Sequence, residues 1–266
     1  MNSFDLAEFI RKSVVKMTSK GNSSHVGSCL SIADILAVIY ADYLDISPKK
    51  FKNIKRDRFV LSKGHAGAAI YSTLAAMGFI DKKILETHYQ NGSILSGHVS
   101  HKSVPGVELS TGSLGHGLSV CCGFAHGMKL DKIKNKVVCL LSDGECDEGS
   151  IWESVLYANH FNLDNLTVII DYNKIQSLDS VENTMKLEPF SSKWSSFGWT
   201  VFECDGHNHD EIKSALNEKT KHPKVIIAHT TKGNGVSFME NNVLWHYRSP
   251  QGEELSKALK ELNHEK

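Results

Sequence analysis

The chain has 266 residues, with 30 Lys and Arg against 30 Asp and Glu, and therefore no formal net charge. This balance excludes the global basic field that attracts nucleic acid. The mean hydropathy is −0.25, and no apolar run approaches the length of a membrane span. The six cysteines show neither a CxxC motif nor the spacing of a disulfide framework, which favours reduced, buried thiols in a cytoplasmic protein.

The first part of the chain predicts helices around one short strand. Residues 1–20 have the apolar spacing of an amphipathic helix, and residues 31–43 predict a second helix with Ser31 as its N-cap. Residues 58–62 read as a short strand that leads into a small-residue helix over 66–77. Residues 84–89 predict another short helix.

The central part predicts two buried strands, one ending at Asp143 and the next at Asn173, joined by a helix over 149–161. Before them, the segment from Gly92 to Gly117 is rich in Gly, Ser and His and shows no periodicity, and such long loops are usually functional. The other predicted elements are a helix over 118–128, a polar surface segment over 176–186, strands over 199–204 and 224–229, a helix over 209–221 and a loop-rich tail after Gly233.

Strands that alternate with helices indicate an α/β fold with a doubly wound parallel sheet. The chain has no internal repeat, no low-complexity linker and no sharp change of composition. We therefore expect residues 1–266 to form one domain.

Asp143 and Asn173 follow neighbouring predicted strands, and ligands in open α/β sheets bind at the carboxyl ends of strands. A carboxylate, an amide oxygen and main-chain carbonyls form a partial set of hard ligands that suits Mg²⁺. Gly144 lets main-chain N–H groups come close to a phosphate. The alternative is that Asp143 and Asn173 only cap helices and turns.

Four histidines lie in turn contexts, and two of them directly follow a glycine: His25, His65, His98 and His246. A single histidine of this kind is more often structural than catalytic. Four together make a polyhistidine pocket plausible, because imidazoles bind hydroxyl groups and move protons near neutral pH.

Seven motifs in order resemble the N-terminal subunit of a split transketolase, the half that binds the diphosphate end of thiamine diphosphate. They are residues 24–28 (SHVGS), 59–65 (FVLSKGH), 96–98 (SGH), 110–117 (STGSLGHG), 142–149 (SDGECDEG), 171–176 (DYNKIQ) and 231–241 (TKGNGVSFMEN) with Trp245-His246.

The resemblance implies Mg²⁺ ligands, cofactor contacts and substrate contacts. The Mg²⁺ ligands would be Asp143, Asn173 and the main-chain carbonyl of Ile175. Gly144 would contact the diphosphate, and Gly112 and Leu114 would lie against the rings of the cofactor. The residues of the substrate channel would be His25, His65, His98 and His246.

The resemblance gives two further residues different roles. Glu148 matches an acidic residue that links two cofactor sites across a dimer interface. His116 matches a position that is often Gln, so we expect it to be structural or to flank the cofactor.

The sequence departs from the family pattern at four positions, which are Ser24, Val26, Ser142 and Tyr247. Three of the changes are small. Tyr247 stands where Gly is usual and places a phenol beside His246, so it puts the size or identity of the substrate in doubt.

A transketolase of this kind transfers a two-carbon ketol unit from a ketose or ketose phosphate to an aldose acceptor. The family also needs a glutamate beside the aminopyrimidine of the cofactor, and that residue lies on a pyrimidine-binding domain. We expect a second chain to supply this domain in an α2β2 heterotetramer.

Several alternatives remain. The alternating acids Asp143, Glu145 and Asp147 suggest a calcium loop, but Glu148 and Ser154 stand where such a loop needs Gly and Glu. A zinc hydrolase is a second alternative, but the sequence lacks the closely spaced His and Cys ligands of a zinc site. Other thiamine diphosphate enzymes (resembling 1-deoxyxylulose-5-phosphate synthase or a ketoacid dehydrogenase α subunit) and a non-catalytic interaction subunit stay open.

Overall fold

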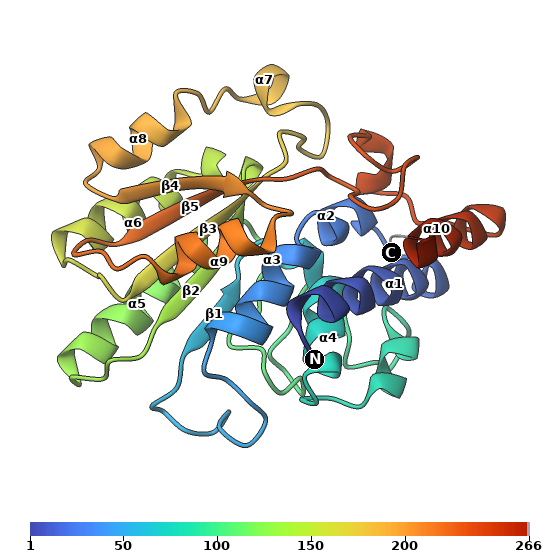
Figure 1. Ribbon diagram of the computed structural model, residues 1–266, viewed down its shortest axis with the longest axis horizontal. Helices are drawn as coiled ribbons and strands as arrows, with labels where there is room; N and C mark the ends of the chain where they lie inside the picture. Colours follow the sequence, from blue (N-terminus) through green and yellow to red (C-terminus); the bar gives the residue numbers. More distant parts are fainter. Residues whose placement is uncertain (265–266) are drawn as a thin grey trace.

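Five parallel strands form the centre of the computed structural model, which describes residues 1–264 (Figure 1). Their order in the sheet is β1-β2-β3-β5-β4, so the strands that precede Asp143 and Asn173 are neighbours. The strands are β1 Arg58–Leu61, β2 Val137–Ser142, β3 Leu166–Tyr172, β4 Thr200–Asp205 and β5 Lys224–His229.

The central strands β2 and β3 are buried along their whole length, which explains their continuous apolar sequences. Alternate side chains of each strand enter two separate hydrophobic cores. In β2, Val138 and Leu140 face one core, whereas Val137, Cys139 and Leu141 face the other. The expected doubly wound sheet, with helices on both faces, is confirmed.

The helices divide between these two cores. Helices α1 Ser3–Gly21, α3 Ala33–Val38, α4 Gly67–Ala76, α9 His209–Asn217 and α10 Glu253–His264 contribute to one core, with the short α2 Val26–Leu30. Helices α5 Gly117–Leu130, α6 Gly149–His160 and α8 Phe190–Ser196 contribute to the other. The short helix α7 Val181–Thr184 lies in the loop after β3.

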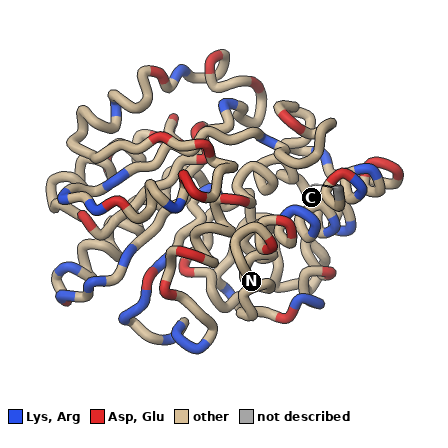
Figure 2. The backbone as a smooth tube through the Cα atoms, in the orientation of Figure 1, with Lys and Arg blue, Asp and Glu red and all other residues tan. Residues whose placement is uncertain are grey.

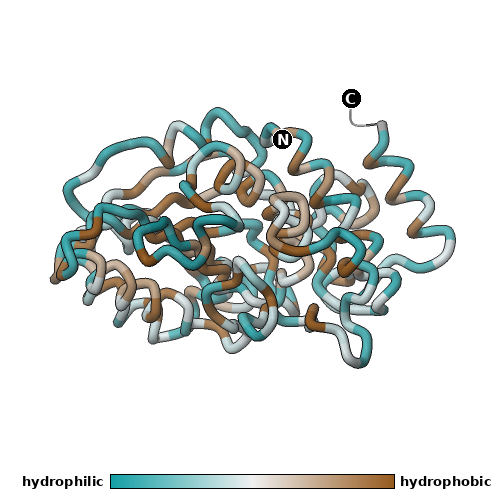
Figure 3. Tube along the Cα trace, turned by 90° about the horizontal axis from the view of Figure 1, so that it is seen from below, coloured by the Kyte–Doolittle hydropathy of each residue, from teal (hydrophilic) through white to brown (hydrophobic). Residues whose placement is uncertain are grey.

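Charged residues are spread over the whole fold, whereas hydrophobic residues concentrate in its interior. Basic and acidic residues are interspersed along the chain (Figure 2), and hydrophobic stretches run mainly through the interior (Figure 3). All six cysteines are free and buried. Within residues 1–264, no helix is long and apolar enough to cross a membrane.

The prediction of one helix over 31–43 with Ser31 as N-cap was wrong. The chain forms α2, then α3, then a π-helical turn at Ile39–Tyr43. Ser31 ends α2 instead of starting a helix. Its hydroxyl donates to the main-chain oxygen of Ser28 and, at 2.7 Å, to Asp171 Oδ2. A long-range bond to a buried carboxylate therefore replaces the local cap.

The prediction of a loop-rich tail after Gly233 also needs correction. A 3₁₀ turn spans Val243–His246, and α10 follows it. Helix α10 packs against α1 and buries Ala258 and Leu262. The helix α8 was also missed. By contrast, residues 92–116 contain no helix or strand, as expected.

Candidate active site

Asp143 lies at the carboxyl end of β2 beside the end of β3 and is only 2% exposed. One carboxylate oxygen accepts from the main-chain N–H of Gly144 and the other from that of Lys174, each at 2.7 Å. Burial, and then the nearby charge of Asp171, raise the pKa of Asp143 to about 7. The position therefore favours an added positive charge.

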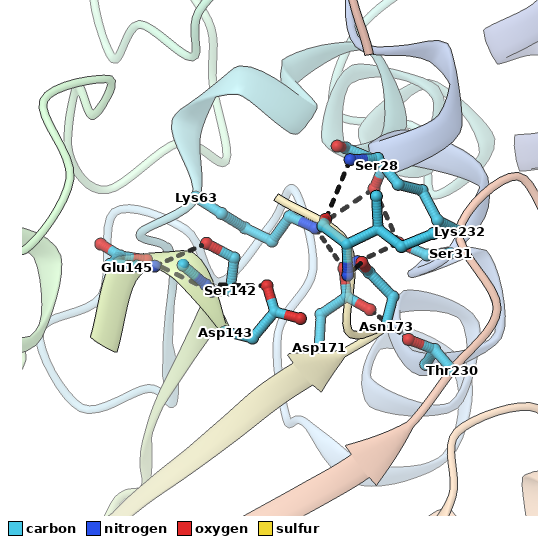
Figure 4. A network of polar contacts seen from close by, with 12 residues as sticks. Ser28, Ser31, Lys63, Ser142, Asp143, Glu145, Asp171, Asn173, Thr230 and Lys232 are labelled. Atoms are coloured by element: carbon cyan, nitrogen blue, oxygen red, sulfur yellow. Dashed lines mark hydrogen bonds and ion pairs between the residues drawn. The ribbon is translucent and has the colours of Figure 1, made fainter. Parts of the chain in front are cut away.

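Asp171 is a buried acceptor that ties several segments together (Figure 4). Its carboxylate forms an ion pair with Lys63 and accepts from the hydroxyls of Ser31 and Thr230. Burial opposes its charge, but Lys63 and these hydroxyls hold the pKa of Asp171 below its usual value. Its Oδ2 also lies 3.0 Å from Asn173 Nδ2. The amide nitrogen of Asn173 is thereby engaged, and its oxygen is the acceptor end, which accepts from the main-chain N–H of Ile175 at 3.1 Å.

The four histidines come together from distant segments. The ring of His25 lies 5.2 Å from that of His65, 5.5 Å from that of His98 and 5.0 Å from that of His246, between centroids. The main-chain N–H of His25 donates to the main-chain oxygen of His246 at 2.7 Å. His25 adopts a φ of 75°, which is uncommon for a residue other than glycine and is often found at functional sites.

Three histidines of this cluster, His25, His65 and His246, favour their neutral forms. Burial, then His98 and the lysines Lys232 and Lys63, lower the pKa of His25 to about 4. Burial and Lys232 lower the pKa of His246 to about 3. Burial and Lys63 likewise lower the pKa of His65 well below its usual value. Near neutral pH these rings can donate or accept hydrogen bonds and accept protons.

Lys232 is almost fully buried between the histidines and the loop after β3. Its ammonium group donates to the main-chain oxygens of Ile175 at 3.0 Å and Gln176 at 2.9 Å. It also lies 3.0 Å from His246 Nδ1. Burial, then repulsion by Lys63, lower the pKa of Lys232 to about 8. The lysine therefore adds positive charge to the pocket below that pH.

Glu145 holds the loop that carries Gly112 and Leu114. This buried carboxylate accepts from the main-chain N–H of Gly115 at 2.9 Å and from the hydroxyl of Ser62. Burial raises the pKa of Glu145. Glu145 thus has a structural role here, which argues against the calcium loop.

Most of these groups line one cavity of about 250 Å³, whereas Asp171 and Glu145 are outside its lining. All four predicted histidines line it, together with six of the predicted cofactor residues, which are Gly112, Leu114, Asp143, Gly144, Asn173 and Ile175. Glu148 and His116 are exposed and do not line it. The interface role of Glu148 stays a prediction.

Sequence reasoning missed the roles of Lys63, Lys232 and Asp171. Both lysines stand in quoted motifs directly after or near a strand, beside glycine, and that context was the available signal. Among residues 1–264, no group of three His, Cys, Asp or Glu side chains has an arrangement suited to a metal ion. This finding gives no support to the zinc alternative.

The comparisons with known proteins show the family of the chain. The family model described as "Transketolase, thiamine diphosphate binding domain" matches residues 3–265. The chain is 43% identical over 256 residues to a subunit of the apulose-4-phosphate transketolase of Phocaeicola vulgatus, covering 95% of this chain and 91% of that protein. It is 38% identical over 262 residues to a 6-deoxy-6-sulfo-D-fructose transketolase subunit of Clostridium sp., covering 97% of this chain and 95% of that protein.

Solved transketolases share the fold. The structure of transketolase from Campylobacter jejuni matches with a TM-score of 0.91 and 34% identity, over 99% of this chain and 43% of that one. Human transketolase is 36% identical over 243 residues, which are 91% of this chain and 39% of that protein. The chain therefore belongs to the transketolase family, as a thiamine diphosphate-binding domain similar to the corresponding subunits of split transketolases.

Proposed function

We propose that this chain is the diphosphate-binding subunit of a two-chain transketolase. The assembly would transfer a two-carbon ketol unit from a ketose or ketose phosphate to an aldose acceptor. The observation that carries the proposal is the meeting of Asp143, Asn173 and Ile175 with four histidines in one cavity. Oxygen ligands for a metal and imidazoles for sugar hydroxyls lie side by side there.

The residues present fit a hard divalent cation such as Mg²⁺. The carboxylate of Asp143, the amide oxygen of Asn173 and the main-chain carbonyl of Ile175 are its preferred ligand types. Among residues 1–264, the described hydrogen bonds to the Asp143 carboxylate come from main-chain N–H groups. Its raised pKa marks a carboxylate that a cation would stabilise.

The residues also fit thiamine diphosphate. Gly144 would face the diphosphate, Lys232 would add charge, and Gly112 and Leu114 would contact the rings. When bound, the cofactor supplies a nucleophilic carbon for the ketose carbonyl and an electron sink for the two-carbon fragment. The protein must position the sugar and move protons around that chemistry.

The neutral histidines can both position the sugar and move protons. His25, His65 and His246 lie with ring centroids 5.0 to 5.8 Å apart, a spacing at which hydroxyl groups of one sugar can reach more than one ring. Each ring can accept a proton from a hydroxyl as a carbonyl forms, and return it in the reverse step. His98 would complete the channel at its exposed side.

A second chain would complete the catalyst. Relatives similar over nearly their whole length are named as single subunits of transketolases, whereas this chain spans about two-fifths of full-length transketolases. We propose a C-terminal subunit with a pyrimidine-binding domain and its glutamate, in an α2β2 assembly.

Titration calorimetry tests the metal and cofactor assignment. Thiamine diphosphate should bind to the chain, or to its complex with the second subunit, only when Mg²⁺ is present. Asp143→Asn should abolish that binding. Asp164→Asn, an exposed carboxylate at the opposite end of β3, is the matched control and should bind normally. Equal affinity with Mg²⁺ and with a chelator would contradict the metal assignment.

A turnover assay tests the division into two chains. The purified chain should be inactive with ketose phosphate donors, and adding the second subunit should produce ketol transfer. Turnover by the homogeneous chain alone would overturn this part of the proposal.

A further inference from the structure

His207 connects the cofactor pocket to a buried acid on the opposite side of the loop after β5. It lies between β4 and α9, and its side chain is 20% exposed. Its Nδ1 is 2.8 Å from Asp34 Oδ2, and its Nε2 accepts from the main-chain N–H of Thr231 at 2.8 Å. Thr231 directly precedes Lys232 in the sequence.

The contact with Thr231 determines the tautomer of His207. A main-chain N–H can only donate, so Nε2 must carry a lone pair, and the ring hydrogen of the neutral form lies on Nδ1. That hydrogen points to the carboxylate of Asp34. The side-chain amide of Asn234 lies 3.2 Å from the same Nδ1, and either orientation of this amide leaves the Thr231 contact unchanged.

Asp34 is a rigid support for this ring. It is buried in α3 and forms an ion pair with Arg11 of α1. Its other oxygen lies 3.0 Å from Nε2 of His209, whose ring stacks on Phe4. Burial opposes the charge of Asp34, but the two histidines and Arg11 hold its pKa well below the usual range.

The supported segment bears the lysine of the pocket. Thr230 donates to Asp171 and, through its main-chain N–H, to Tyr172, and Gly233 N donates to the main-chain oxygen of Gly27. Between these anchors, the described hydrogen bond of the Thr231 N–H is the one to His207. The placement of Lys232 against Ile175 and His246 therefore depends in part on His207.

We propose that His207 is a positioning residue: in its Nδ1–H form it transmits the fixed position of Asp34 to the main chain at Thr231, and so holds Lys232 in the cofactor pocket. The importance of Lys232 for the cofactor rests on the function proposed above. The hydrogen-bond relay itself does not, and it can be tested without cofactor.

Two substitutions separate the two ends of the ring. His207→Gln keeps an acceptor near the position of Nε2, so it can still receive the Thr231 N–H. His207→Asn keeps a donor near the position of Nδ1 for Asp34, but it is too short to reach Thr231. A role in folding alone would not distinguish the two variants in this order.

Nuclear magnetic resonance on the full chain reads the relay directly. Long-range ¹H–¹⁵N spectra should show His207 protonated at Nδ1 and not at Nε2. Hydrogen exchange at the Thr231 amide should be about three- to tenfold faster in His207→Asn. In His207→Gln, which still accepts from Thr231 but has lost the Nδ1–H that faces Asp34, the exchange should be faster than in the wild type by a smaller factor. His229→Gln, an exposed histidine of β5, is the control and should leave Thr231 protected.

The signal of His246 Nδ1 reports the position of Lys232, its 3.0 Å neighbour. It should shift in His207→Asn and shift less in His207→Gln. With Mg²⁺ and thiamine diphosphate, calorimetry should then show weaker binding in the Asn variant than in the Gln variant. An Nε2–H tautomer, or equal Thr231 exchange in both variants, would overturn the relay. Loss of cofactor binding in every protein, wild type included, with the exchange pattern intact would instead contradict the proposed function.

Discussion

The ammonium group of Lys232 lies 3.0 Å from the main-chain oxygen of Ile175, the carbonyl expected to bind the metal ion. A carbonyl oxygen has two lone pairs, so Ile175 can hold both the lysine and a cation. Lys232 therefore places a positive charge at the end of the sheet even without a bound metal ion.

The first prediction concerns the pH dependence of cofactor binding. The pKa of Lys232 is lowered to about 8, so the lysine is charged below that pH and attracts the diphosphate. Affinity for thiamine diphosphate at fixed Mg²⁺ should fall as the pH rises through 8, by at most about tenfold per unit. Calorimetry from pH 7 to 9 measures this, and Lys232→Met should bind more weakly and lack the fall. If the affinities of the wild type and of Lys232→Met changed with pH in the same way, the role of Lys232 would be contradicted.

The second prediction concerns stability without metal. The pKa of Asp143 is raised from 3.8 to about 7, so the folded state binds more protons than the unfolded state between these values. This group's contribution to the free energy of unfolding is therefore lost as the pH rises from about 4 to about 7, by an amount on the order of a few kcal/mol. Urea unfolding in chelator should show that Asp143→Asn removes this loss. Mg²⁺ should stabilise the wild type more than the variant.

The third prediction separates sugar chemistry from cofactor binding. His246→Ala should lower kcat/KM of the complete enzyme by roughly 10²–10⁴, the usual range for a positioned proton-transfer group. Cofactor affinity should change little, because the other contacts of Lys232 with Ile175 and Gln176 remain. The exposed His160→Ala, at the end of α6, is the control. If His246→Ala lost cofactor binding as fully as Asp143→Asn, this placement would be wrong.

The fourth prediction concerns Tyr247, which is 61% exposed and whose ring lies 4.7 Å from that of His246. Tyr247→Gly removes a wall of the cavity without removing a proton carrier. We expect changes in KM and in the ranking of donor sugars, with a smaller change in kcat. Tyr247→Phe keeps the ring and should resemble the wild type. Steady-state kinetics with a series of ketose donors distinguishes these outcomes.

The fifth prediction compares two glycines. The atoms nearest to a Cβ at Gly144 would be those of the flexible side chain of Gln176, at 3.1 Å, whereas a Cβ at Gly64 would lie 2.3 Å from the main-chain oxygen of Thr111. Gly144→Ala should therefore fold normally and bind thiamine diphosphate more weakly. Gly64→Ala should destabilise the fold by about 1–3 kcal/mol. Thermal unfolding and calorimetry on both variants check the contrast.

The strand ends were predictable because short-range patterns determine them. The apolar runs before Asp143 and Asn173 read as buried strands, and parallel strands place their carboxyl ends at one edge of the sheet. The family motifs supplied Gly112, Leu114 and Ile175 of the cavity, but not the roles of Lys63 and Lys232. Helix α10 could also have been predicted, because Leu255, Ala258, Leu259 and Leu262 recur at helical spacing. The glycines that precede it led to the prediction of a loop instead.

Long-range polar contacts could not be predicted in the same way. Ser31 is 140 residues from Asp171, and Asp34 is 173 residues from His207. Nothing local distinguishes such a serine from a helix cap, or such a histidine from a solvent-exposed loop residue. Their roles depend on which loops the folded sheet brings together.

The burial of all six cysteines has a practical consequence for labelling. Burial raises the pKa of five of these thiols, those of Cys29, Cys122, Cys139, Cys146 and Cys204, and only thiolates react readily with alkylating reagents. The folded wild-type chain should therefore react slowly with maleimides. A single cysteine introduced at the exposed Tyr247 would then carry a fluorophore at the mouth of the cavity on an almost unreactive background.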